Sequence, residues 1–480
     1  MDTVITKSLK ENIKKVKEIF HNSSDLKVRH VHSGICDVGI IYLDGIIDTE
    51  LLQAFVIKPL SEFIYTDNKE NNTIEHFLEG MIEALEIKFS YKFNQLIDAI
   101  VNGDTVLLIN GTTRAVIIPS VMWKERSIEE SLGERSPRGP VIGLTEKLKT
   151  NVNILRSSIK TPDFCVEQLE IGTKSKTAIS ILYLNDIVDN EILLEVKTRI
   201  NTLTNLKFLP NSRIVEDVIE GKPSTIFPLA RVSERIDSLS SALYEGRVVV
   251  IIDGFPHAII APSLFVEFIQ APDEYHLKFG RFSIRFLRFV GFLAGIFLPG
   301  IYVAIANFHK DDLPQKITKL VISDVELMPT FWEMLILLII IRMLIDASFR
   351  LPKSAVLLVS LIGTIVIGQT AVTAKLIHPV SLIIVGITTL SSFLVLYRGF
   401  GAAEVTLRFL MLIIGHYLDY LGLTVAATVL VIYLVSLKSV GVPYLSPLIP
   451  LRINELKDTF IRGNLKKLTD SKHTYQHKSD

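Results

Sequence analysis

Hydrophobic and polar residues are distributed in two different ways along this chain. Over roughly the first 280 residues, apolar runs of strand or helix length alternate with charged stretches, as they do in domains that fold in water. From Phe286 to Leu437, long uncharged runs follow one another, and the change occurs near the basic stretch 276–289. Because a membrane-spanning helix needs about 20 apolar residues, the pattern predicts a water-soluble N-terminal region followed by an α-helical, polytopic membrane domain.

The N-terminal region contains one pattern twice. The stretch 38–52 resembles 179–193, and the stretch 99–120 resembles 242–263, so both pairs recur about 140 residues apart. Identical residues at matched positions are Tyr42 and Tyr183, Asp48 and Asp189, Gly103 and Gly246, Gly111 and Gly254, and Pro119 and Pro262. Self-similarity at a fixed spacing indicates a duplicated domain.

Each copy reads as an α/β lobe. A β-branched run suited to a buried strand precedes a helical stretch that begins near the matched aspartate. Each copy ends with a helix, a glycine at the position of a left-handed C-cap, and two strands around Asn110–Gly111 or Asp253–Gly254. Asp48 and Asp189 fit helix N-caps, and the alternative is contact with a ligand in a cleft between the lobes.

Between the copies, the stretch 136–160 has the pattern of an amphipathic helix. Its apolar stripe consists of Val141, Leu144, Leu148, Val152, Leu155 and Ile159. The basic residues at other positions indicate either a solvated face on a helix that bridges the lobes or an oligomer contact.

These patterns divide the chain into five parts. They are a first α/β lobe at 1–126, a connecting amphipathic helix segment at 127–165, a second α/β lobe at 166–275, a transmembrane helical domain of about five to six membrane segments at 276–440, and a basic cytoplasmic tail at 441–480.

The composition agrees with this mixed character. Of the 480 residues, 49% are hydrophobic and 21% are charged, and the mean hydropathy of +0.38 is too apolar for an ordinary soluble protein. The formal net charge is zero and no basic patch interleaved with aromatic residues occurs in the N-terminal region, so nucleic acid is not an expected partner.

Cysteine usage and the N-terminus bear on the compartment. Cys36 and Cys165 are the only cysteines, too few for a disulfide framework and without the clustered partners of a zinc site. We therefore expect a reducing compartment and no metal or other cofactor. The first 20 residues have no apolar core of a secretory signal, so the N-terminal region is predicted to be cytoplasmic.

Five apolar stretches are candidate membrane segments. They are 286–306, 330–349, 355–374, 379–397 and a longer stretch at 407–437. Basic residues flank the predicted cytoplasmic ends of these segments, as is typical of membrane proteins. Lys375 does not fit this distribution of positive charge. These flanking residues are Lys278, Arg281, Arg285, Arg288, Arg350, Lys353, Arg398 and Arg408.

The last stretch raises a problem of topology. A single crossing would send the basic tail outside, against the distribution of positive charge, yet 31 residues are too few for two full spans. Gly415, His416, Asp419 and Gly422 mark a place where a helix can break, which is tolerated at membrane depth when protein or water shields the backbone. We therefore predict a shortened hairpin or a re-entrant element.

A few polar residues within the apolar stretches are candidates for a pore. Arg342 lies inside the second stretch, and Asp346, one helical turn later, is within reach of an ion pair. Either this pair is structural and buried between helices, or it lines a water-filled conduction path. The further candidates are Glu333, Gln369 and Thr373. For the third stretch, which contains Gln369 and Thr373, helix packing is the alternative role.

Several ordered motifs resemble the A subunit of the GerA family of spore germination receptors, from about Cys36 to Arg462. They are RGPVIGLTEKLKTNVNILR (138–156), SERIDSLSSALYEGRVVVIIDGFPHAIIAPS (233–263), PGIYVAIANFH (299–309), RLP (350–352), IGQTAV (367–372) and GVPYLSPLIP (441–450). In the first motif, Arg138, Gly139 and Pro140 are candidates for coupling or assembly.

This resemblance implies a receptor in the inner membrane of a dormant bacterial spore. It implies a permease-like B subunit, thought to take the nutrient, and a lipoprotein C subunit as partners. It also implies that A subunits self-associate in the lipid bilayer into an oligomeric, nutrient-gated ion channel, with two related α/β subdomains in the cytoplasm.

The chain departs from the pattern of that family at acidic positions. Glu333 and Asp346 keep two acidic residues of the span that ends in RLP, whereas Leu338, Arg342 and Thr373 occupy the place of three others. The family signature E-R-P-D reads ERID at 234–237. If the acidic residues line a cation path in relatives, these substitutions alter its selectivity.

Three other classes of function are alternatives to a receptor channel. A secondary transporter would show discontinuous spans and intramembrane charges, but the membrane half has no detectable internal repeat. An enzyme is not expected, because the chain has no phosphate-binding glycine loop, no paired cysteine ligands and no G-x-S-x-G motif. The last alternative is a scaffold that holds partner membrane proteins and conducts nothing.

Overall fold

A computed structural model describes most of the chain as two compact units. It describes residues 4–33, 36–62, 87–121, 143–221, 225–270, 281–310, 328–348, 368–395 and 397–452, together with 312, 314, 350 and 352. Among these, the N-terminal unit contains the residues up to Gly221 and the stretch 230–262. The helical unit contains the short stretch 225–229 and the described residues from Ser263 onward.

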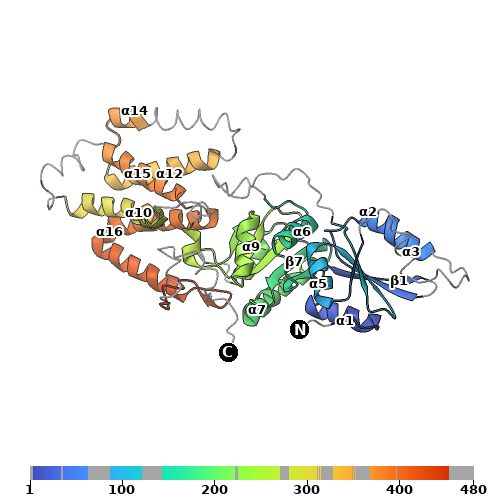
Figure 1. Ribbon diagram of the computed structural model, residues 1–480. Helices are drawn as coiled ribbons and strands as arrows, with labels where there is room; N and C mark the ends of the chain where they lie inside the picture. Colours follow the sequence, from blue (N-terminus) through green and yellow to red (C-terminus); the bar gives the residue numbers. More distant parts are fainter. Residues whose placement is uncertain are drawn as a thin grey trace, which may run out of the picture. The chain divides into compact units, whose positions relative to one another are not determined.

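The first lobe of the N-terminal unit is a five-stranded antiparallel sheet with helices. Its elements are α1 (Leu9–Ile19), β1 (Leu26–Ser33), β2 (Cys36–Leu43), α2 (Thr49–Leu52), the π-helix η1 (Gln53–Ile57), α3 (Lys58–Glu62), β3 (Lys88–Ser90), α5 (Phe93–Asn102), β4 (Thr105–Ile109) and β5 (Ala115–Ile118). The strand order is β1-β2-β4-β5-β3 (Figure 1).

The second lobe repeats this topology. Its elements are α6 (Leu148–Ser158), β6 (Phe164–Ile171), β7 (Thr177–Leu184), α7 (Asn190–Asn201), the 3₁₀-helix η2 (Thr202–Asn205), α8 (Arg213–Glu220), β8 (Arg231–Ser233), α9 (Ile236–Tyr244), β9 (Val248–Ile252) and β10 (Ala258–Ala261). The strand order β6-β7-β9-β10-β8 corresponds element by element to that of the first lobe. The predicted duplication is confirmed.

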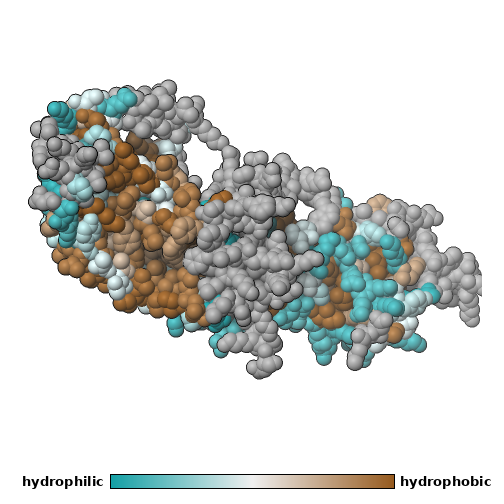
Figure 2. All heavy atoms as spheres, turned by 60° about the vertical axis from the view of Figure 1, so that its left-hand side comes forward, coloured by the Kyte–Doolittle hydropathy of each residue, from teal (hydrophilic) through white to brown (hydrophobic). Residues whose placement is uncertain are grey.

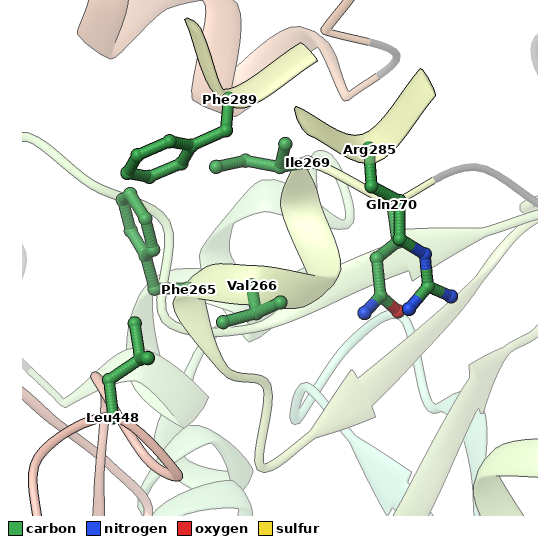
Figure 3. A pocket seen from close by; sticks show the side chains of 7 residues that line it. All are labelled: Phe265, Val266, Ile269, Gln270, Arg285, Phe289 and Leu448. Atoms are coloured by element: carbon green, nitrogen blue, oxygen red, sulfur yellow. The ribbon is translucent and has the colours of Figure 1, made fainter. Parts of the chain in front are cut away.

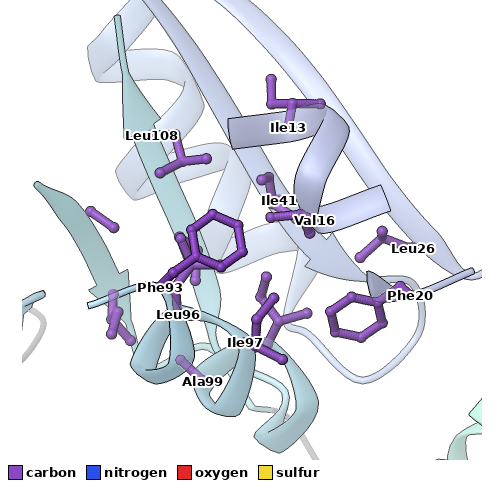
Figure 4. Close-up of a cluster of buried hydrophobic side chains, with 14 of the residues drawn as sticks. Ile13, Val16, Phe20, Leu26, Ile41, Phe93, Leu96, Ile97, Ala99 and Leu108 are labelled. Atoms are coloured by element: carbon purple, nitrogen blue, oxygen red, sulfur yellow. The ribbon is translucent and has the colours of Figure 1, made fainter. Parts of the chain in front are cut away.

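Strands β4 and β5 of the first lobe are buried along their whole length because helices cover both faces of the sheet there. Leu108 lies with residues of α1 and α5 in one hydrophobic core (Figure 4), to which Val106 also belongs, whereas Leu107 and Ile109 belong to a second core with the helical stretch 49–62. Continuous apolar runs are typical of parallel sheets. Here the ladders are antiparallel, and coverage of both faces has the same effect on the sequence.

The repeated residues identified in the sequence cap helices. The Asp48 carboxylate accepts a hydrogen bond from the Glu50 backbone N–H (2.9 Å), and Asp189 accepts one from Glu191 (2.8 Å). Gly103, which ends α5, adopts the left-handed φ of 94° that only glycine adopts without strain. Helix capping by the matched aspartates is therefore confirmed.

The residues of each hairpin turn also start the first helix of their lobe. Asn110 Oδ1 accepts a hydrogen bond from the Leu9 backbone N–H (3.3 Å), and Asp253 Oδ1 accepts one from Leu148 (3.1 Å). A turn that is distant in sequence thus supplies the N-terminal cap of a helix.

Helix α6 is shorter than the amphipathic stretch 136–160 predicted. It begins at Leu148, where the cap from Asp253 lies, and Leu144 precedes it in an extended segment. The apolar residues Leu148, Val152 and Leu155 lie in the core of the second lobe, so α6 occupies the place that α1 has in the first lobe.

The two lobes meet at a buried arginine of α6. The Arg156 side chain is 1% exposed, and its Nε and Nη2 donate to the two carboxylate oxygens of Asp25 in the first lobe, both at 3.0 Å. Nη2 also reaches Ser23 Oγ (3.3 Å), and the guanidinium lies 4.5 Å from the centre of the Phe164 ring. The prediction of a solvated face for this helix is wrong at Arg156, whose buried side chain connects the second lobe to the first.

The helical unit contains apolar helices of different lengths. They are α10 (Arg281–Phe308), α12 (Thr330–Ser348), α14 (Gly368–Thr373), α15 (Pro379–Phe393) and α16 (Arg398–Ser436), followed by the strands β11 (Lys438–Ser439) and β12 (Val442–Pro443). Among the described residues, the stretches Ile284–Phe308 and Gly399–Ser436 are long and apolar enough to cross a membrane. Hydrophobic side chains dominate the visible surface of this unit (Figure 2).

Helix α16 breaks and turns back. Asp419 has the non-helical φ of 57° and ψ of −161°, within the region where the sequence predicted a break. Before it, Arg408 contacts Gly295, and Asp419 itself contacts His309, so the first half of α16 runs in the same direction as α10. After it, Leu423 lies against Gly300, which the first half also contacts, so the second half returns.

The Arg156–Asp25 pair is predicted to hold the two lobes together. We expect Arg156→Met to lower the free energy of unfolding of the N-terminal unit by about 3–5 kcal/mol, because it leaves the Asp25 carboxylate buried without its cation. The measurement is urea unfolding of the full-length chain in detergent, followed by pulse proteolysis of the N-terminal unit.

Lys149→Met is the matched control. Lys149 belongs to the same helix and forms an exposed pair with Asp44 of the first lobe at 2.7 Å. Its loss is expected to cost less than about 1 kcal/mol, because exposed ion pairs contribute little. Equal effects of the two substitutions would contradict the role given to Arg156.

Candidate functional site

The predicted pair of Arg342 and Asp346 is present on α12. Arg342 Nη2 lies 3.3 Å from Asp346 Oδ1, and the two side chains are 45% and 53% exposed. The pair is therefore formed within one helix and is not buried between helices of this chain. Two ionised groups on the outer surface of an otherwise apolar helix favour contact with water or with another protein chain.

Gln369 and Thr373 lie on α14 with exposed side chains. The Thr373 hydroxyl donates a hydrogen bond to the Gln369 carbonyl oxygen (2.9 Å), which satisfies it within the helix. The Gln369 side chain remains exposed. Arg138, Gly139 and Pro140, the candidates for coupling or assembly, lie outside the described residues.

Glu333, the remaining candidate, is turned into the helical unit. Its side chain is 2% exposed, and its carboxylate accepts hydrogen bonds from the His378 backbone N–H (2.5 Å) and from Ser381 Oγ (2.8 Å). A negative charge at the N-terminus of α15 is stabilised by the helix dipole. Nine residues separate Glu333 from Arg342, a rise of about 13 Å along α12, so the structure does not bring these two candidates together.

A second charged pair, Glu404 and Arg408, lies buried in the first half of α16. Arg408 Nη2 is 2.5 Å from Glu404 Oε1, and Arg408 Nε donates to the Gly295 carbonyl oxygen of α10 (2.5 Å). Ser392 of α15 donates to the same Glu404 oxygen (2.7 Å). One ion pair thus joins three apolar helices.

The position of Arg408 differs from the prediction. It was counted among basic residues that flank the cytoplasmic end of a span, but its side chain is buried against its own helix and two others. The available signal was the four-residue spacing of Glu404 and Arg408, which places both on one helical face beside the small residue Gly295. A side chain added at Gly295 would collide with Glu404 Oε1, so the glycine makes room for the pair.

Aromatic side chains gather where the stretch 225–229 joins the helical unit. The Phe400 ring lies 5.5 Å from the Phe227 ring, 5.4 Å from that of Phe265 and 4.9 Å from that of Phe292. The Ser439 hydroxyl donates to the Leu229 carbonyl oxygen (2.5 Å) and accepts from the Ser263 backbone N–H (2.9 Å). The stretch 225–229 and Ser263 are therefore held by contacts within the helical unit.

The cavities offer little for a polar ligand. A small cavity of about 20 Å³ beside Phe265, Phe289 and Arg285 has room for about one water molecule (Figure 3). A larger groove of about 590 Å³ lies between the two halves of α16. It is lined by apolar residues and Tyr433 and lacks charged groups that would orient a polar molecule. Among the described residues, no three of His, Cys, Asp and Glu gather to hold a metal ion.

Comparisons with known proteins find relatives along nearly the whole chain. A family model described as "Bacillus/Clostridium GerA spore germination protein" matches residues 14–474. "Spore germination protein KA" of Bacillus subtilis (strain 168) is 32% identical over 467 residues, which cover 96% of this chain and 85% of that protein. The same organism has an "Uncharacterized membrane protein YfkQ" that is 29% identical over 479 residues, with 99% of this chain and 92% of that protein covered.

A solved structure is also similar. It is the crystal structure of the N-terminal domain of the A subunit of the Bacillus megaterium spore germinant receptor GerK3, with 27% sequence identity and a TM-score of 0.43. The match covers 55% of this chain and 98% of that one.

Gly295→Ala is predicted to disrupt the buried Glu404–Arg408 pair. The added methyl group occupies the space of the Glu404 carboxylate, and overpacking of this kind costs about 1–3 kcal/mol. Gly386→Ala in α15 is the control, because a side chain there meets nothing within 4 Å and alanine favours a helix by up to about 1 kcal/mol. Thermal unfolding of the purified chain in detergent should rank Gly295→Ala below the native chain and Gly386→Ala at or above it. Equal stability of both variants would contradict close packing at Gly295.

Proposed function

Since the chain belongs to the GerA family of spore germination proteins, we propose that it is a receptor A subunit that assembles into a nutrient-gated ion channel. The channel would open in the inner membrane of the spore and trigger germination. The observation that carries this proposal is the half-exposed Arg342–Asp346 pair on an apolar helix.

A charged side chain that is exposed to lipid is energetically costly. A charge at the centre of a bilayer costs several kcal/mol or more, so intramembrane charges face partners or water-filled cavities. Within this chain, Arg342 and Asp346 satisfy each other and still leave about half of each side chain exposed. Copies of the chain arranged around a shared aqueous route would keep these exposed atoms away from acyl chains.

The directions of the helices support a topology of six membrane segments. Ser381 contacts Tyr302 near the end of α10, while Leu394 lies against Gly291 near its beginning, so α15 runs opposite to α10. The contact between Glu333 and His378 places the starts of α12 and α15 at the same end of the helical unit. If the apolar stretch 355–374 of the sequence is a further membrane segment, the total with α10, α12, α15 and the two halves of α16 is six crossings.

An even number of crossings would place the basic tail on the cytoplasmic side. Both ends of α16 then lie on the side where α10 begins, which is the predicted cytoplasmic side because of the basic residues in 276–289. The tail that follows Arg452 would share that side, as the distribution of positive charge requires. The break at Asp419 supports the shortened hairpin predicted for this stretch.

The proposed complex includes other subunits. A permease-like B subunit would take the nutrient, and a lipoprotein C subunit would complete the receptor, as the likeness to this family implies. The lobes of the N-terminal unit would govern opening through the anchored stretches 225–229 and 263–270. Leu338, Arg342 and Thr373 replace acidic residues expected along a cation path, so we propose a selectivity different from that of relatives.

A secondary transporter is the second candidate. The broken helix α16 and the buried Glu404–Arg408 pair favour it, since transporter sites use discontinuous helices and intramembrane charges. The break, however, lies level with the end of α10 at His309 and not at the middle of the helices. Uptake of labelled nutrient by vesicles that contain this chain alone would support the transporter instead.

Charge changes at Arg342 are predicted to alter ion selectivity. In liposomes that contain the reconstituted complex, Arg342→Glu should raise the cation-to-anion permeability ratio at least about fivefold, because one unit charge in a narrow aqueous path contributes more than 1 kcal/mol. Arg342→Leu should have an intermediate effect. Reversal potentials in asymmetric salt are the measurement.

The control is Met343→Leu, on the neighbouring face of α12, which should leave permeability unchanged. All variants must assemble to the same extent as the native complex. Unchanged conductance and selectivity in both Arg342 variants would remove the pore role and favour a non-conducting scaffold.

A further inference from the structure

The break in α16 is surrounded by titratable side chains from three elements. His309, just past the end of α10, lies with Nε2 at 2.9 Å from both carboxylate oxygens of Asp419. Its other ring nitrogen, Nδ1, is 2.9 Å from Asp312 Oδ2. The Tyr420 ring lies over the imidazole with a centroid separation of 4.6 Å. One imidazole therefore bridges two carboxylates across the end of the helical unit.

The backbone at Asp419 is strained. Its φ of 57° with ψ of −161° lies at the margin of a region that is essentially restricted to glycine. Conformations of this kind cost about 1–3 kcal/mol and persist only where surrounding contacts hold them. Both oxygens of the Asp419 side chain are engaged by His309, so the imidazole supplies such a contact.

Both nitrogens of this imidazole face acceptors. A neutral imidazole carries one N–H and can donate to one carboxylate, whereas the protonated ring donates to both. Hydrogen bonds to Asp312 and then to Asp419 raise the pKa of His309 above its ordinary value. The geometry therefore favours the protonated ring over the neutral one.

We propose that His309, Asp312 and Asp419 form a proton-binding latch that holds the break in α16. With a proton bound, His309 bridges the two carboxylates and keeps Asp419 in its strained conformation. Without it, the bridge loses one hydrogen bond and its ionic attraction, and the strain is released by a change in the angle between the two halves of α16. This inference goes beyond the proposed channel and does not require that the chain conducts ions.

The direction of the pH dependence follows from linkage. A histidine with a pKa raised in the folded state stabilises that state fully below its ordinary pKa of about 6.5. This contribution is lost as the pH rises through the raised pKa. The latch is therefore closed in mildly acidic solution and opens as the solution becomes alkaline.

Other titratable groups near the latch, among the residues that the structure describes, have contacts of their own. His416, one turn before Asp419, has its Nδ1 2.7 Å from Asn307 Nδ2 and is stacked on Phe331 of α12 at 4.2 Å. Glu333, also on α12, is engaged by His378 and Ser381 of α15. Lys310 follows His309 on the same segment and is a nearby basic residue. Of these, His416 is the group that could imitate a His309 titration, so it needs its own variant.

The test is a distance between the two halves of α16 as a function of pH. Spin labels are attached through Ile413→Cys and Ile432→Cys, two exposed positions on opposite sides of the break, in a chain with Cys36→Ser and Cys165→Ser. The full chain is placed in nanodiscs of phosphatidylethanolamine and phosphatidylglycerol. Distances between the spin labels are measured by pulsed electron–electron double resonance from about pH 5.5 to about pH 9, on both sides of the ordinary histidine pKa.

We expect one narrow distance at the acidic end, whose population falls by more than half toward the alkaline end. His309→Gln should show the alkaline distribution at every pH. Asp312→Asn should move the midpoint to lower pH, because it removes one of the two carboxylates that favour the proton. His416→Gln should leave the transition in place.

Asp419→Gly separates strain from charge. Glycine adopts the same backbone angles without cost. This variant should therefore keep the narrow distance at all pH values, although His309 has lost the Asp419 carboxylate and retains only Asp312. The proposal is overturned if the native distance does not change with pH, or if the transition survives in His309→Gln. Since the readout is a distance, either result is independent of whether the channel conducts.

Discussion

A charge that leaves water needs a partner, and this constraint organises both units. In the N-terminal unit, Arg156 is buried against Asp25, and the pair joins two lobes that are otherwise separate sheets with their own cores. In the helical unit, Arg408 and Glu404 join α10, α15 and α16 in the same way. Breaking such a pair leaves an uncompensated ion, so each pair specifies one arrangement of the elements around it.

The same constraint separates charges that stabilise from charges available for function. Glu333 and Arg408 are buried with their hydrogen-bond partners and take part in helix packing. Arg342 and Asp346 are paired as well, but they remain half exposed on an apolar helix. Only the second kind of charge needs something outside this chain, and for that reason the proposed pore rests on it.

The fold of the N-terminal unit was largely predictable, because its evidence is local and occurs twice. The matched aspartates and glycines cap helices as expected, and the two lobes share one strand order. The helix preceding each repeat was harder to place. Leu144 continues the helical periodicity of α6, yet Asp253, more than 100 residues away, determines that the helix begins at Leu148.

For the candidate site, the sequence by itself determined which stretches are apolar, that Arg342 and Asp346 are one turn apart, and that α16 breaks between Gly415 and Gly422. These are properties of neighbouring residues and of helical periodicity. Only the tertiary structure decided that Glu333 faces inward, that Arg408 is a buried partner of Glu404, and that His309 reaches Asp419. The physical reason is that burial of a charge depends on which helix packs against it, and residues 45 to 113 positions apart make those contacts.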